Sequence, residues 1–149
     1  MKPTTDPELR FLRNYKRAVS SFNILDRNMA LCLQWAAHYA GKETEMDSFL
    51  ALPYDRKFSK IKSLIMKKGQ GSEYQEFIRL AEMCRLWRNK LVHGEWELTY
   101  RDENVRFHVL VPIEEKGSFT HEEFEALATM IENANNQFSR LRDEHPIEG

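Results

Sequence analysis

The sequence predicts a mainly α-helical fold, a four-helix up-and-down-type bundle with a β-hairpin inserted before the last helix. Apolar residues recur with a 3.6-residue period over four long stretches, which is typical of amphipathic helices. One stretch, at about residues 95–112, instead alternates or is β-branched, as expected for strands. The 149 residues are 42% hydrophobic, which is enough for the core of one domain but not of two full ones.

The first expected helix covers about residues 6–40. It begins at Asp6-Pro7-Glu8, an N-cap residue followed by proline and an acid, and Gly41 is its expected end. We expect so long a helix to bend or break near residues 20–21. Its apolar face comprises Phe11, Leu12, Tyr15, Ala18, Val19, Phe22, Leu25, Met29, Cys32, Leu33, Ala36 and Ala40.

Three further helical segments are expected before the strands. A short one, at about residues 45–52, is stopped by Pro53. A second amphipathic helix covers about residues 55–68 and ends at Gly69. A third opens at Ser72, with Gln75 at the spacing of a capping box, and stops at residue 94.

The expected hairpin pairs residues 96–100 with residues 105–111 and is ended by Pro112. Thr120 and Glu123 form a second capping box, which predicts the start of the last helix. Residues 1–142 are therefore expected to form a single helical domain that includes the hairpin at about 95–112. We expect residues 143–149 to be a frayed C-terminal tail.

Composition excludes several classes of protein. The formal net charge of −1 argues against a purely electrostatic nucleic-acid binder, although it leaves room for a local basic face. No run of about 18 apolar residues and no secretory signal are present, so we expect a cytoplasmic protein without a membrane association. The sequence contains no CxxC, HExxH, GxGxxG or GxxxxGK[ST] motif, so no metal and no cofactor are expected.

Cys32 and Cys84 both lie inside helical apolar patterns, and they are expected to be reduced thiols of the core. Trp35, Trp87 and Trp96 are interpreted as core or hairpin packing rather than as platforms for stacked bases.

A basic run occupies the helix at about residues 55–68. On a helical wheel, Arg56, Lys60 and Lys67 lie within roughly 40° of one another. Such a stripe can follow the phosphates of a nucleic acid, and these three residues are the candidate phosphate contacts. The alternative is a solvated helix face without a ligand. The whole run comprises Arg56, Lys57, Lys60, Lys62, Lys67 and Lys68.

The segment Arg88-Asn89-Lys90-Leu91-Val92-His93 closes an expected bundle helix. It resembles the R-x(4–6)-H signature of the HEPN superfamily, in which a polar residue, often Asn, follows the Arg. The resemblance implies a small helical bundle that is typically dimeric. It also implies either a metal-independent ribonuclease of toxin–antitoxin, phage-defence or RNA-processing systems or a binding module that has lost catalysis.

The residue types in this segment suit cleavage of RNA by its own 2′-hydroxyl. His93 supplies an acid–base group that titrates near neutral pH. Arg88 offers a planar fork of donors to the negative charge of the transition state. Asn89 precedes His93 by four positions and shares its helix face, so it could orient the imidazole or a phosphate. Without a ligand, His93 would be a C-terminal cap and Asn89 an exposed polar residue.

Arg88 falls within the apolar arc of its helix, where a charge needs a partner or a functional reason. Asp26 has a similar setting in the first helix, and an Asp26–Arg88 pair is one interpretation. Arg88 and His93 are also about 140° apart around an ideal helix. They converge only if Arg88 reaches around, if the last turn is distorted, or if a second chain completes the site.

The leading hypothesis is a HEPN-like homodimer that cuts RNA at Arg88, Asn89 and His93. The alternative is a non-catalytic regulatory module on the same scaffold, acting through RNA or a protein partner such as a cognate antitoxin. A third interpretation is an unrelated helical interaction protein in which Arg88 is a buried structural ion.

Overall fold

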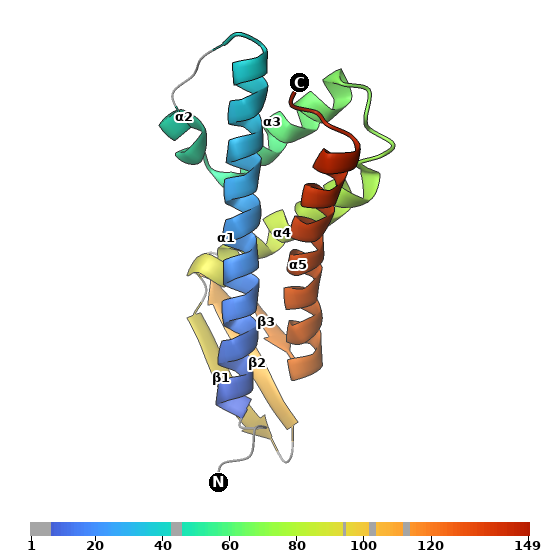
Figure 1. Cartoon of the computed structure of the whole chain (residues 1–149). Helices are drawn as coiled ribbons and strands as arrows, with labels where there is room; N and C mark the ends of the chain where they lie inside the picture. Colours follow the sequence, from blue (N-terminus) through green and yellow to red (C-terminus); the bar gives the residue numbers. More distant parts are fainter. Residues whose placement is uncertain (1–6, 43–45, 94, 102–103, 112–113) are drawn as a thin grey trace.

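The computed structural model describes the backbone of residues 7–42, 46–93, 95–101, 104–111 and 114–149, and the side chains of residues 9–42, 48–88 and 120–149. In these ranges the chain is mainly helical, with one small sheet (Figure 1). The elements are α1 (Pro7–Tyr39), α2 (Met46–Leu50), α3 (Tyr54–Lys67), α4 (Gln75–His93), β1 (Glu95–Arg101), β2 (Asn104–Val111), β3 (Glu114–Phe119) and α5 (His121–Glu144).

The two longest helices, α1 and α5, lie side by side and run in the same direction (Figure 1). Arg10 in the first turns of α1 pairs with Glu125 in the first turns of α5, and Arg17 further along pairs with Glu132. The helical bundle is confirmed, but the up-and-down order is wrong. The reason is that the sheet carries the chain from the end of α4 back toward the N-terminal end of α1, where α5 begins (Figure 1).

The stretch that was expected to form a single hairpin belongs to a three-stranded antiparallel sheet in the order β1-β2-β3. In the β1–β2 pair, Glu95 is opposite Leu110 and Arg101 is opposite Asn104. β3 then pairs with β2, with a shift in register between Val109 and Val111. The expected pairing of residues 96–100 with residues 105–111 is present as β1–β2, but a hairpin alone is not the structure of this region, because β3 adds a third strand.

The helix ends show which local sequence signals correctly predicted where a helix begins or ends. Gly41 and Gly69 have φ angles of 72° and 69°, the left-handed conformation that closes α1 and α3. The hydroxyl of Thr120 accepts a hydrogen bond from the backbone N–H of Glu123 at 3.1 Å, so the predicted cap of α5 is confirmed. The predicted start at Ser72 is wrong, because α4 begins at Gln75. The expected break in the first helix is also wrong, because α1 is continuous.

The core between α1, α3, α4 and α5 combines aromatic and aliphatic side chains. Phe77 stacks on Phe138 with ring centroids 4.6 Å apart, and Phe11 stacks on Phe124 at 5.2 Å. Cys32 and Cys84 are both buried in this core as free thiols, as predicted. Burial raises the pKa of the Cys84 thiol to about 12, so it stays protonated and unreactive at neutral pH.

The C-terminal residues after α5 pack against the bundle, so the expectation of a frayed tail is wrong. Ile147 is fully buried. The hydroxyl of Tyr74 donates a hydrogen bond to the backbone carbonyl of His145 at 2.7 Å, and Arg142 pairs with Glu148. The physical reason is that three contacts act together on the tail: the buried Ile147 side chain, the Tyr74–His145 hydrogen bond and the Arg142–Glu148 ion pair.

Candidate functional site

The Arg88–His93 segment forms the last turns of α4, and its backbone is α-helical up to His93. Distortion of the last turn is therefore excluded as a way to bring Arg88 and His93 together, since five helical residues separate them by about 140° around the axis. The side chains of Asn89 and His93 lie outside the described residues. The remaining ways to complete the site are a long reach by Arg88 and a contribution from a second chain.

Arg88 is half-buried, and its surroundings differ from those of the other half-buried arginines. Arg10, Arg85 and Arg142 each pair with a glutamate: Glu125 at 2.7 Å, Glu82 at 2.6 Å and Glu148. Among the carboxylates whose side chains are described, none forms an ion pair with Arg88. Its guanidinium therefore lacks a fixed counter-charge from the described part of the chain.

Asp26 pairs with Lys57, not with Arg88. The distance from Lys57 Nζ to Asp26 Oδ2 is 2.8 Å, and the Lys57 side chain is only 3% exposed. The interpretation of a buried Asp26–Arg88 pair is thus wrong. Lys57 was counted with the basic run, although on a helical wheel it lies about 40° from Ile61, at the edge of the apolar arc. That position was the signal that could have identified it as the partner.

The α3 stripe, Arg56, Lys60 and Lys67, is exposed to solvent along its whole length. None of the three residues pairs with a described carboxylate. This arrangement agrees with both interpretations of the stripe, a phosphate track and a solvated face, so its role as a phosphate contact stays a prediction.

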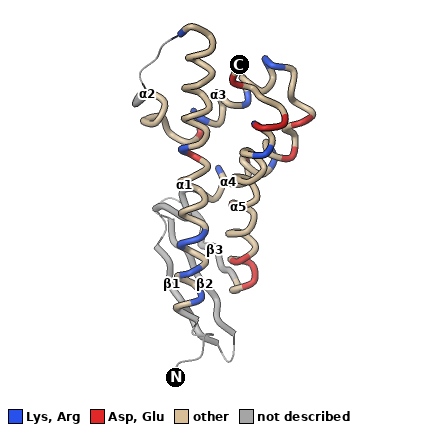
Figure 2. Tube along the Cα trace, in the orientation of Figure 1, with Lys and Arg blue, Asp and Glu red and all other residues tan. Residues whose placement is uncertain are grey.

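Sequence reasoning missed a second basic surface, on α1. Arg13, Lys16 and Arg27 are exposed and form no ion pair with a described carboxylate. Figure 2 shows the basic residues gathered on the N-terminal half of α1, beside the acidic start of α5. Arg10 and Arg17, on the neighbouring face of α1, form ion pairs with Glu125 and Glu132 of α5. A helical wheel of α1 would have separated these two sets of cations.

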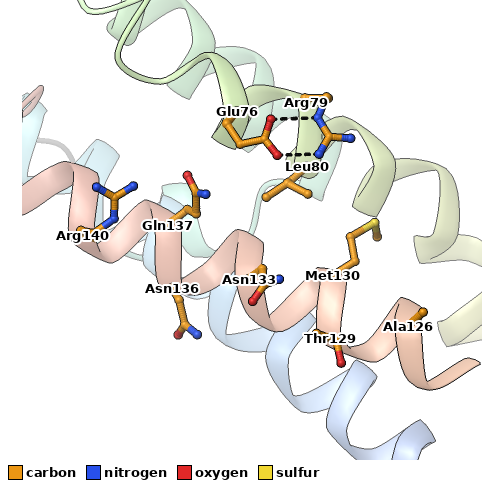
Figure 3. Close-up of a pocket in the computed structure, with 10 residues that line it drawn as sticks. All are labelled: Glu76, Arg79, Leu80, Ala126, Thr129, Met130, Asn133, Asn136, Gln137 and Arg140. Atoms are coloured by element: carbon orange, nitrogen blue, oxygen red, sulfur yellow. Dashed lines mark hydrogen bonds and ion pairs between the residues drawn. The ribbon is translucent and has the colours of Figure 1, made fainter.

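A groove of about 670 Å³ lies between α4 and α5 (Figure 3). Gln137 and Met130 point from α5 toward α4, where Glu76 and Arg79 are joined by two hydrogen bonds. The second arginine of the groove, Arg140, pairs with Glu144 at 3.1 Å. Both cations are therefore neutralised, and no histidine or cysteine is among the lining residues. We find no catalytic arrangement in this groove.

No group of three or more His, Cys, Asp or Glu side chains in the described part of the chain is arranged to hold a metal ion. Every helix in the same residues is too short or too polar to cross a lipid bilayer. A comparison of the chain with protein-family models, curated proteins and solved structures finds no match.

Proposed function

We propose that this chain is a metal-independent endoribonuclease of the HEPN type, with its active site at the end of α4. The observation that supports this proposal is the setting of Arg88, a half-buried guanidinium that pairs with no described carboxylate. A cation kept partly out of water is destabilised unless an anion approaches it. The phosphate of an RNA strand would supply that anion, with two oxygens matched to the guanidinium fork.

Each residue of the segment has a separate task in this proposal. His93 takes the proton of the 2′-hydroxyl or gives one to the leaving 5′-oxygen as the bond to phosphorus breaks. Arg88 stabilises the negative charge that grows on the phosphate oxygens. Asn89 lies one turn before His93 on the same face of α4, where it would orient the imidazole or a phosphate.

The active form in this proposal is a symmetric homodimer. The regular helix up to His93 separates Arg88 from His93 around the axis, so one chain supplies the cation and its partner the acid–base group. α4 also carries Leu86 close to the Arg88–His93 segment, and this apolar side chain is 61% exposed. We expect the two copies of α4 to approach each other there.

A second candidate function is a non-catalytic module that binds RNA or an acidic regulatory protein. The exposed cations of α1 and α3 that form no ion pair with a described carboxylate favour it. They would attract a polyanion whether or not the α4 segment is catalytic. The toxin–antitoxin or phage-defence context belongs to the first candidate and a regulatory role to the second.

The test is an assay of purified protein with end-labelled single-stranded RNA in excess EDTA. Cleavage that persists in EDTA and is lost with His93→Ala supports the ribonuclease. Binding without cleavage on varied RNAs selects the non-catalytic module. Cleavage that requires a divalent ion would overturn the proposed mechanism.

A further inference from the structure

We infer that the exposed face of α1 binds single-stranded nucleic acid, with cations holding the phosphates and an aromatic pair stacking on the bases. Arg13, Lys16, Ser20, Asn23 and Arg27 fall within about 80° around the helix axis. All are hydrogen-bond donors, and only Glu8 and Asp26 are acidic in the whole of α1. We call these five residues the α1 track. The choice of a nucleic acid as the ligand rests on the proposed function, whereas the position of the site on α1 does not.

The cations of the α1 track make none of the ion pairs that join α1 to α5 in the described part of the chain. Arg10 and Arg17, which stand before and after Arg13 and Lys16 in the sequence, make the ion pairs to α5. Arg13, Lys16 and Arg27 are exposed and pair with none of the described carboxylates. A row of unpaired cations on one side of a rigid helix complements an extended anion such as a phosphodiester chain.

An aromatic pair lies past the α1 track, at the C-terminal end of the helix and to one side of the track. Trp35 is 48% exposed and stacks on Tyr39, with ring centroids 5.9 Å apart and an interplanar angle of 28°. Trp35 lies about 12 Å beyond Arg27 along the axis and about 80° from the middle of the α1 track around it, on the side of Arg17. Large exposed rings beside a cationic track are the combination with which proteins bind single strands, because every base offers a face for stacking.

This face fits a nucleic acid better than it fits a membrane. An interfacial membrane helix inserts its apolar face into the lipid. The apolar face of α1 is already buried in the protein core through Phe11, Phe22 and Leu25. The exposed apolar residues of its outer side are scattered, and the side chains between them are basic or polar.

The experiment measures binding of labelled single-stranded RNA to the full chain carrying His93→Ala, in EDTA, over a range of salt concentrations. Arg13→Ala/Lys16→Ala/Arg27→Ala should reduce the slope of log K against log salt by about 2, near 0.7 for each cation lost. The matched control is Arg79→Ala/Arg85→Ala/Arg140→Ala. It removes the same charge from arginines that already have acidic partners, and it should leave the slope unchanged.

A second arm tests the aromatic pair. Trp35→Ala should weaken binding by about tenfold at every salt concentration, because stacking is not electrostatic. Met66→Ala, which truncates a side chain that is 67% exposed on α3, should have no effect. Single-stranded DNA should compete with the RNA, and duplex RNA should compete poorly because its bases are not free to stack.

Equal effects of the two triple variants, or no effect of Trp35→Ala, would overturn the inference. So would binding of the protein to anionic lipid vesicles with no binding to single strands. Absence of cleavage by the wild-type protein together with intact binding would instead reject only the proposed ribonuclease.

Discussion

Lys57 Nζ lies 2.8 Å from Asp26 Oδ2, and this pair joins α3 to α1 in the interior of the bundle. The lysine side chain is 3% exposed and the aspartate side chain 28%. Oδ1 of Asp26 is also buried, without a hydrogen-bond partner among the described residues. The pair thus accounts for the aspartate in the apolar arc of α1 and leaves Arg88 without that partner.

The two members of this pair should respond differently to substitution. Asp26→Ala leaves a buried ammonium without its counter-charge and is expected to cost about 3–5 kcal/mol. Lys57→Met removes the buried charge, and the carboxylate that remains is partly hydrated, so a smaller loss of stability is expected. Urea unfolding of both variants measures the difference. Equal losses would mean that the pair is not buried as the structure has it.

The C-terminal tail should protect one of the two thiols. Truncation after Glu144 removes Ile147, a fully buried residue. Loss of a buried side chain of this size lowers the free energy of unfolding by about 2–5 kcal/mol. The truncated chain should melt at a lower temperature, and Cys32 should react with a thiol reagent while Cys84 stays protected. Glu148 of the tail and its partner Arg142 in the last turn of α5 act electrostatically on Cys32 but not on Cys84. Equal reactivity of the two thiols would contradict this role of the tail.

His121 predicts a loss of stability in mild acid. Burial, followed by repulsion from Arg10, lowers the pKa of this imidazole in the folded protein. The unfolded chain therefore binds a proton more readily than the folded one below about pH 6.5. The free energy of unfolding should accordingly fall as the pH drops through this range. Urea titrations of the wild type and of His121→Gln should show a shallower pH dependence in the variant, and identical curves would rule out His121 as the cause.

Mixing two inactive variants tests whether the two subunits of a homodimer share one active site. Arg88→Ala and His93→Ala chains are each expected to be inactive alone. If the site joins Arg88 of one chain to His93 of its partner, a mixture of the two variants regains part of the wild-type cleavage rate, since one site of each mixed dimer is intact. Light scattering should first show a dimer at micromolar concentration. A monomer, or a mixture that stays inactive although mixed dimers form, would contradict a shared site.

Features coded by a few neighbouring residues could be predicted from the sequence. Thr120 caps α5 because its hydroxyl needs only the N–H three residues on, and Gly41 ends α1 because glycine accepts a positive φ at little cost. β3 was missed because its sequence, Glu-Glu-Lys-Gly-Ser-Phe, has no β-branched residue, and only pairing with β2 makes it a strand.

Features that depend on distant contacts could not be predicted in this way. The parallel course of α1 and α5 follows from the return of the chain through the sheet, which no helical pattern encodes. Trp35 was expected in packing but is half exposed, because it lies to one side of the core residues Cys32 and Leu33 around the helix axis. Trp87, by contrast, packs against the core as expected. Arg88 was correctly identified as unusual, but its lack of a described counter-charge required the structure.

The central claim is that Arg88, which pairs with no carboxylate among the described residues, binds the scissile phosphate. The most direct measurement compares RNA cleavage in EDTA by Arg88→Ala and by Arg85→Ala. Arg85 lies on the same helix but is already paired with Glu82. We predict that Arg88→Ala lowers the cleavage rate by about 10²-fold or more while Arg85→Ala stays close to wild type. Equal rates for the two variants, with both proteins folded, would contradict the claim.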